Sequence, residues 1–304
     1  MSVLSQIPPD VLSELRAEGA LPRATLNRDY NARASVTPER FEAEMSRYRA
    51  LSEPARTRPA AALDIVYDET SGQTLDVFGA AAPGERLRPV FVFIHGGYWR
   101  ALSKLDSAFM ANPLADKGLA TATIDYRLAP EASLDEIVRE VRQAVAFLWR
   151  RGANYGIDPQ RIFIGGSSAG GHLTGAVLAG GWHADANIPE NVIKGALAIS
   201  GLFHLAPIAA SFVQDWMRLT ARQVSDLSPA EHLPRIGCPL IVAYAAGEPA
   251  GFARQSRVYH ALWGAAGHPG RLIEVPQRNH FDVVLDLADP DTVLSRTLIE
   301  LMRG

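Results

Sequence analysis

The 304-residue chain contains one cysteine, Cys238, so it can form no disulfide within itself and no metal cluster built on cysteines. It also has little net charge: the formal value of −3 gives no electrostatic reason to expect nucleic acid or an anionic membrane as a partner. No stretch reaches the ~18 consecutive apolar residues of a membrane span, and the start of the chain lacks the basic segment and apolar run of a signal peptide. We therefore expect a cytoplasmic protein with neither a nucleic-acid nor a membrane partner.

What the chain does contain is a regular alternation of apolar runs and helical stretches. Short runs that are apolar on both faces are typical of parallel strands covered by helices on each side. The expected strands are 90–94, 119–124, 162–164, 196–199, 240–244 and 271–275. This alternation predicts an α/β fold with a mostly parallel, doubly wound sheet.

Two further elements can be read from local patterns. The segments 63–67 and 73–78 alternate in polarity around a Ser-Gly pair, which predicts an antiparallel hairpin ahead of the sheet. Ser133 and Glu136 have the spacing of a capping box in front of an apolar helical stripe. We expect a helix to begin there.

We expect one domain with a helical lead-in. Residues 1–60 are weakly apolar and include an amphipathic stretch over 38–51, so we interpret them as a lead-in packed on the domain. Residues 61–304 would form that single domain. Within it, 202–235 interrupts the alternation with aromatic residues and prolines, and we interpret this excursion as a wall or lid of a pocket.

The strand at 162–164 breaks into glycines around two adjacent serines. A Gly-x-Ser-x-Gly pattern fits only as residues 166–170, because centring it on Ser167 would require glycine at Ala169. A strand, a sharp turn and a helix start are typical of a nucleophile elbow, whose glycines relieve crowding and whose helix aims amides at developing negative charge. Ser168 is therefore the candidate nucleophile. The alternative is an ordinary glycine-rich loop between a strand and a helix.

A serine nucleophile needs a base to accept its proton and an acid to orient that base. In α/β-hydrolases the acid follows the nucleophile, and the histidine follows the last strand. Of the eight histidines, His280 stands after the expected final strand, so we choose it as the base. Glu248 is the carboxylate that keeps this order, whereas Asp226, Asp282 and Asp286 would break it.

An oxyanion hole is expected where a His-Gly-Gly sequence follows the strand at 90–94. Gly96 and Gly97 would let backbone N–H groups turn toward a carbonyl oxygen without a Cβ in the way. The amide of Ala169 is expected to join them, and we assign His95 to holding the loop. The alternative is a simple tight turn.

Three aromatic residues near these elements are candidates for contact with the substrate. Tyr98, Trp99 and Phe281 would pack against an aromatic ring, or else they are ordinary core residues. We expect no metal and no organic cofactor, because hydrolysis by a serine, a histidine and a carboxylate needs neither.

The loop at 95–99 together with the elbow at 166–172 resembles the kynurenine formamidase (arylformamidase) family of α/β-hydrolases, within the hormone-sensitive-lipase-like esterase group. Three further stretches are similar to that group: Asp-Tyr-Arg-Leu-Ala-Pro at 125–130, Phe-Ala-Arg-Gln-Ser at 252–256 and Asn-His-Phe-Asp at 279–282. The family's acid stands four residues before that first phenylalanine. In this chain that position is Glu248, the residue already chosen.

The chain departs from the family pattern near the expected pocket. Aspartate is more usual where Glu248 stands, Gly251 replaces an acidic residue, and Gln214 occupies a position for asparagine. These differences leave the expected serine, acid and histidine intact. They affect the expectation of which substrate the pocket accepts.

The resemblance implies hydrolysis of N-formylkynurenine to kynurenine and formate through an acyl-enzyme. Two alternatives stay open: a carboxylesterase that acts on small or aromatic esters with the same residues, and a non-catalytic binding protein with the hydrolase fold. The expected partner is a small aromatic amide or ester. The sequence leaves the oligomeric state open, a homodimer included.

Overall fold

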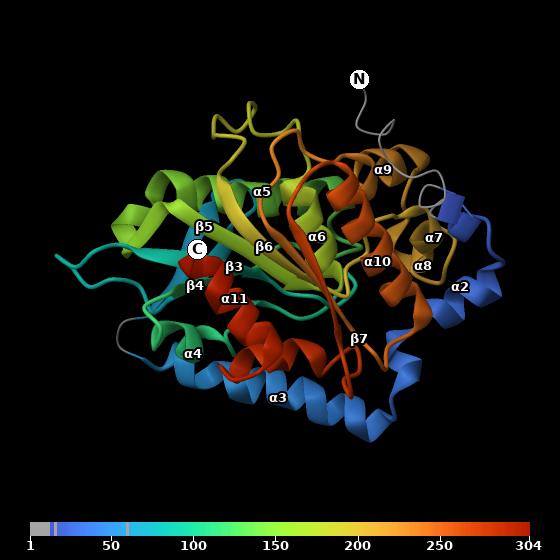
Figure 1. Ribbon diagram of the computed structural model, residues 1–304, viewed down its shortest axis with the longest axis horizontal. Helices are drawn as coiled ribbons and strands as arrows, with labels where there is room; N and C mark the ends of the chain where they lie inside the picture. The colour runs from blue at the N-terminus through green and yellow to red at the C-terminus, as the bar shows by residue number, and fades with distance from the viewer. Residues whose placement is uncertain (1–12, 15–16, 59–60) are drawn as a thin grey trace.

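One eight-stranded sheet is the framework of the computed structural model, which describes residues 13–14, 17–58 and 61–304 (Figure 1). The strands are β1 (Ala62–Asp68), β2 (Gln73–Phe78), β3 (Arg88–Ile94), β4 (Ala120–Ile124), β5 (Ile157–Ser167), β6 (Ile193–Ile199), β7 (Leu240–Ala245) and β8 (Gly270–Val275). They lie in the order β1-β2-β4-β3-β5-β6-β7-β8, where β2 is antiparallel to β1 and β4 and the other neighbours are parallel. The predicted α/β-hydrolase fold, with its leading hairpin and mostly parallel sheet, is confirmed.

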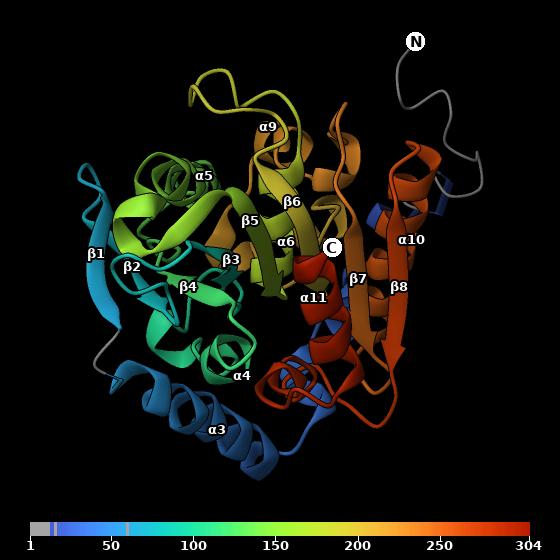
Figure 2. The ribbon, with the colours of Figure 1, turned by 60° about the vertical axis from the view of Figure 1, so that its left-hand side comes forward.

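Different helices cover the two faces of the sheet (Figure 2). One face carries α5 (Leu134–Arg151), α6 (Ala169–Leu178) and α10 (Ala250–Ala265), and the other carries α3 (Pro38–Arg56), α4 (Ala111–Ala115) and α11 (Val293–Arg303). In β3, Val90, Val92 and Ile94 join the first core, whereas Phe91 and Phe93 join the second. Burial on both faces therefore explains the unbroken apolar runs. No helix in the described ranges has the length and apolar character needed to span a membrane.

Within the described part of the lead-in, helices α2 (Arg23–Asp29) and α3 pack against α10 and α4 respectively. Residues 1–12, 15–16 and 59–60 of the predicted lead-in at 1–60 lie outside the described residues. Helix α3 continues to Arg56, beyond the amphipathic stretch that ends near residue 51, and in these last turns Ser52 and Ala55 are buried. Ser52 Oγ accepts a hydrogen bond from the Ala108 N–H at 2.9 Å, which fixes this end of the helix.

The excursion at 202–235 lies beside α2 (Figure 1). It contains three short α-helices, α7 (Ala206–Ala209), α8 (Gln214–Met217) and α9 (Ala221–Asp226), followed by a 3-10 turn at Pro229–Glu231. The Phe212 N–H donates to the Asn27 side-chain oxygen at 2.7 Å, so the excursion and the lead-in are joined directly.

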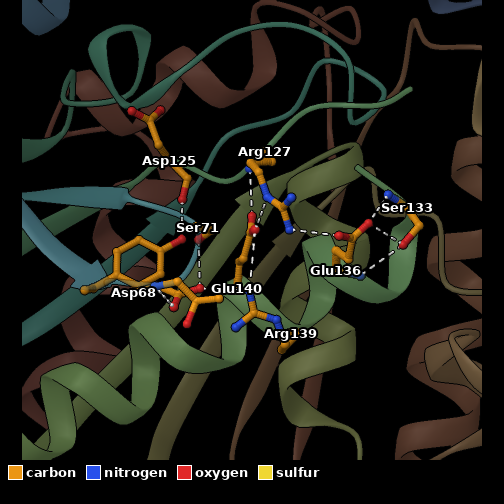
Figure 3. Close-up of polar contacts among 10 residues, drawn as sticks. Asp68, Ser71, Asp125, Arg127, Ser133, Glu136, Arg139 and Glu140 are labelled. Atoms are coloured by element: carbon orange, nitrogen blue, oxygen red, sulfur yellow. Dashed lines mark hydrogen bonds and ion pairs between the residues drawn. The ribbon is translucent and has the colours of Figure 1, made fainter. Parts of the chain in front are cut away.

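Helix α5 begins at the predicted capping box. The Glu136 N–H donates to Ser133 Oγ at 3.4 Å, and the Ser133 N–H donates to the Glu136 carboxylate at 2.9 Å. The same carboxylate accepts a hydrogen bond from Arg127 Nη2 at 3.1 Å (Figure 3). The start of the helix is therefore tied to the segment that follows β4.

A buried charge strengthens that tie. The Glu140 side chain is 0% exposed, and its carboxylate accepts hydrogen bonds from both the main-chain N–H and the Nε of Arg127 (Figure 3). A buried carboxylate is tolerated when it is paired and hydrogen-bonded, as it is here. This pair therefore anchors the 125–130 stretch on α5.

Replacing Arg127 with methionine should lower the free energy of unfolding by about 2 kcal/mol, because the buried Glu140 carboxylate loses its nearer guanidinium and keeps only Arg139, 3.7 Å away, as an ion-pair partner. Urea denaturation measures the change. Arg235→Met is the matched control, since the exposed Arg235 pairs with Glu190 at 2.9 Å on the surface, where such a pair contributes about 0–1 kcal/mol. Equal losses in the two variants would contradict a stabilising role for the buried pair.

Candidate active site

Ser168 lies at the sharp turn between β5 and α6. Its backbone has φ 59° and ψ −117°, a conformation that strains a residue other than glycine. A Cβ at Gly166 would lie 2.5 Å from the carbonyl oxygen of Gly170, and a Cβ at Gly170 would overlap the carbonyl oxygen of Ile94. The two glycines are therefore required by close backbone contacts. The predicted sequence of strand, sharp turn and helix is confirmed.

His280 and Glu248 are brought together from loops that follow neighbouring strands. His280 follows β8, Glu248 follows β7, and His280 Nδ1 lies 2.8 Å from Glu248 Oε2. Their side chains are 5% and 0% exposed. Because a carboxylate accepts, this pairing favours the tautomer of the neutral imidazole in which Nδ1 carries the proton and the lone pair is on Nε2. The ring of Phe252 packs on the imidazole with the centroids 4.1 Å apart.

The loop that follows β3 lies against the elbow. A Cβ at Gly96 would lie 2.8 Å from the Ser167 carbonyl oxygen and 3.4 Å from the Ser168 Cβ. Gly97 has φ +92°, and a Cβ there would overlap the main chain of Ala101. The two glycines therefore allow this loop to approach Ser168 as closely as it does.

Tyr126 holds the glycine loop from behind. Its hydroxyl lies within donating distance of the carbonyl oxygens of His95 and Gly96, at 3.0 and 3.2 Å. Its ring stacks on the imidazole of His95 with the centroids 4.1 Å apart. Burial lowers the pKa of His95 to about 4, so the imidazole is neutral near pH 7. Its surroundings suit a role in packing and hydrogen bonding.

His172 plays a comparable structural part on α6. Burial lowers its pKa to about 4, and its Nε2 donates to the Leu227 carbonyl oxygen at 2.9 Å. The bond links the helix of the elbow to the 202–235 excursion.

A cavity of about 360 Å³ contains both Ser168 and His280 in its wall. Two groups of aromatic contacts make up much of that wall. Tyr98, Phe212 and Trp216 pack edge to face with centroids 5.7–6.1 Å apart. Phe93, Phe109 and Tyr48 form the second group, with centroids 5.5–5.8 Å apart. The cavity is thus suited to a ligand with a flat apolar body.

Of the three predicted substrate contacts, Tyr98 and Phe281 line the cavity. The expectation for Trp99 does not fit its placement, because its side chain is 0% exposed and packs edge-on against His172 at 5.1 Å. Tyr98 and Trp99 have φ of 50° and 56°, and this tight turn places the Trp99 side chain in the core behind the loop. Another tryptophan, Trp216, does line the cavity.

The lead-in supplies cavity residues that sequence reasoning did not identify as site residues. These are Asn31, Ala32, Arg33, Phe41, Met45 and Tyr48. The helical spacing of the last three was visible in the sequence, but it indicates a buried face without saying what that face meets.

The 252–256 stretch clamps the lead-in to the domain. Arg254 pairs with Glu18 at 2.5 Å and with Asp29 at 3.2 Å. The Gln255 side-chain amide donates to the Tyr30 hydroxyl at 2.9 Å. Through these contacts the 252–256 stretch, which follows Glu248, holds the lead-in that forms part of the cavity wall.

Within the described residues, no group of three or more His, Cys, Asp or Glu side chains is arranged to hold a metal ion.

Comparisons with known proteins define the class of this chain. The BD-FAE family model matches residues 75–209. The crystal structure of a Silicibacter sp. protein superposes with a TM-score of 0.75 at 27% identity, covering 92% of this chain and 99% of its own. A Pyrobaculum calidifontis esterase superposes with a TM-score of 0.68 at 18% identity, covering 86% of this chain and 90% of its own. The protein is an α/β-hydrolase, and it is an enzyme of the hydrolase class.

Sequence similarity also assigns the chain to one family within this fold. The kynurenine formamidase of Salmo salar is 31% identical over 257 residues, which span 83% of this chain and 85% of that protein. The chain belongs to the kynurenine formamidase family. This relationship removes the alternative of a binding protein without catalysis.

Tyr126→Phe should lower kcat for a p-nitrophenyl acetate substrate at least about tenfold, because the glycine loop loses the donor that fixes its carbonyls. Tyr67→Phe is the matched control, since the Tyr67 hydroxyl donates to the Asp125 carbonyl at 2.6 Å and lies outside the cavity. Each variant should lose about 1 kcal/mol of stability, but only Tyr126→Phe should lose activity. Equal kcat values for the two variants would show that the loop does not depend on Tyr126.

Proposed function

We propose that this hydrolase cleaves aryl formamides, N-formylkynurenine in particular, through an acyl-enzyme on Ser168. The observation that carries the proposal is that Ser168, in its strained turn, and His280, paired with Glu248 at 2.8 Å, line one cavity. This combination matches the needs of serine hydrolysis, in which a serine hydroxyl requires an oriented base. The membership of the kynurenine formamidase family supports the formamide as the bond cleaved.

In the first half of the reaction, Ser168 Oγ attacks the formyl carbon and His280 Nε2 accepts its proton. Negative charge then develops on the former carbonyl oxygen. The backbone N–H groups of Gly96, Gly97 and Ala169 stabilise that charge by hydrogen bonds. The Glu248 carboxylate stabilises the imidazolium and keeps the Nδ1 proton directed toward itself.

In the second half, the protonated His280 donates its Nε2 proton to the departing arylamine nitrogen as the C–N bond breaks. The formyl group remains as an ester on Ser168. A water molecule then attacks this ester while His280 accepts a proton from it. Formate leaves, and the proton returns to Ser168 Oγ.

The cavity wall supports an aromatic leaving group. Tyr98, Phe212, Trp216 and Phe281 offer ring faces and edges against which an aryl ring would pack. The residues that depart from the family pattern, Glu248, Gly251 and Gln214, do not line the cavity. The Gln214 side chain instead forms two hydrogen bonds with the main chain of Leu219, each 2.9 Å long.

A carboxylesterase is the second candidate function, and one observation favours it. Met45, Phe93, Phe109 and Val284 line the same cavity and give it more apolar surface than a formyl group alone would use. A longer acyl chain would occupy that surface. The same residues would carry out the reaction on an ester.

A comparison of kcat/KM for N-formylkynurenine and p-nitrophenyl butyrate separates the two functions. We expect the formamide to be the better substrate. Negligible turnover of the formamide beside rapid turnover of the ester would contradict the proposal and favour the esterase.

Variants at the site test the residue roles on whichever substrate is faster. Ser168→Ala should lower kcat at least about 10³-fold. Glu248→Gln should lower it about 10²–10⁴-fold, because a neutral amide does not stabilise the imidazolium and can donate to Nδ1, which favours the wrong tautomer. Ser167→Ala is the matched control for the neighbouring hydroxyl and should keep most of the activity. A larger loss in Ser167→Ala than in Ser168→Ala would overturn the choice of nucleophile.

A further inference from the structure

Two arginines line the cavity without a carboxylate partner among the residues that the structure describes. Arg33 and Arg100 are both exposed to solvent, which places them at the opening of the cavity. Across the part of the chain that the structure describes, neither guanidinium group forms an ion pair with Asp or Glu, and the one protein acceptor found is the Val36 carbonyl oxygen, 3.3 Å from Arg33 Nη1. Their N–H donors therefore remain available to a ligand.

Aromatic rings of the cavity wall hold both guanidinium groups. The Cζ of Arg33 lies 4.6 Å from the ring centroid of Phe41, and the Cζ of Arg100 lies 4.3 Å from that of Trp216. Both rings line the cavity themselves. A guanidinium group held over an aromatic ring still has its N–H donors free along its edge, so it can bind a planar anion such as a carboxylate.

The charges in the cavity wall leave a positive excess. Asp106 also lines the cavity, but its carboxylate pairs with Arg49 at 2.9 Å and accepts the Ser103 N–H at 3.1 Å. Among the described residues, no carboxylate lies within ion-pair distance of Arg33 or Arg100, and Arg33 interacts with the exposed Glu39 only at longer range. Since the whole chain has a formal net charge of −3, this excess is a local property of the cavity opening.

We propose that Arg33 and Arg100 form a carboxylate-binding subsite, which makes the enzyme selective for aryl substrates that carry an anionic group away from the scissile bond. The inference rests on the proposed function, because N-formylkynurenine is an aryl formamide with a carboxylate at the far end of its side chain. A guanidinium donates to both oxygens of a carboxylate at once. Neither arginine takes part in bond breaking, so their effect falls on KM.

The test uses two pairs of substrates that differ by a carboxylate: N-formylkynurenine with its decarboxylated analogue N-formylkynuramine, and 4-acetoxybenzoate with phenyl acetate. The enzyme, Arg33→Gln and Arg100→Gln are compared on all four. Arg235→Gln is the control, because this exposed arginine pairs with Glu190 and lies outside the cavity. The readout is the ratio of kcat/KM within each pair, which a general loss of folding would not change.

We expect the unaltered enzyme to prefer the carboxylated member of each pair. Arg33→Gln and Arg100→Gln should each lower that preference about tenfold through a higher KM, and Arg235→Gln should preserve it. An unchanged ratio in both cavity variants, or no preference in the unaltered enzyme, would overturn the subsite. If no formamide is hydrolysed but the ester pair shows the arginine-dependent preference, the formamidase proposal fails and the subsite stands.

Discussion

The elbow around Ser168 is pressed against the end of β3, and the rest of the site depends on this close approach. A Cβ at Gly170 would overlap the Ile94 carbonyl oxygen and lie 2.7 Å from that of His95. The same contact brings the Gly96 loop beside the strained serine. A strained backbone of this type costs about 1–3 kcal/mol and persists only where its surroundings fix it. Here the sheet, covered on both faces, supplies those surroundings.

Helix α10 connects the proposed chemistry to the wall of the cavity. Glu248 stands just before the helix, and Phe252 in its first turn packs on the imidazole of His280. One turn further, Arg254 and Gln255 hold the lead-in. The helix next to the proposed acid therefore also holds the segment that closes the cavity, so one element contributes both to the shape of the cavity and to the alignment of the proposed triad.

The sheet and the elbow could be predicted from the sequence because both are local patterns. Unbroken apolar runs, a capping box and glycines two residues from a serine can each be read within a short stretch of chain, even where the contact behind the pattern is distant, as between Gly170 and Ile94. His280 and Glu248 could be located by their order along an expected fold, although that order says nothing of the 2.8 Å between them. For Trp99 the sequence leaves a substrate contact and a core position open, and the left-handed turn at this residue puts its side chain in the core.

The lead-in shows what a single sequence does not reveal. Its contribution to the cavity depends on contacts between residues more than 200 positions apart, such as Glu18 with Arg254. No local sequence pattern around either residue indicates that the two will form an ion pair. The roles of Arg33 and Arg100 could not be predicted either, because a sequence does not show whether a carboxylate will lie beside an arginine in the fold.

The central claim is that Ser168 is the nucleophile, activated by the strained turn and by His280. Labelling the folded enzyme with a fluorophosphonate, followed by peptide mass spectrometry, tests it most directly, since such reagents capture activated serines. We predict one adduct, on Ser168, that is lost when the enzyme is unfolded before labelling and is absent from Ser168→Ala. An adduct on Ser167, or none on the folded enzyme, would contradict the claim.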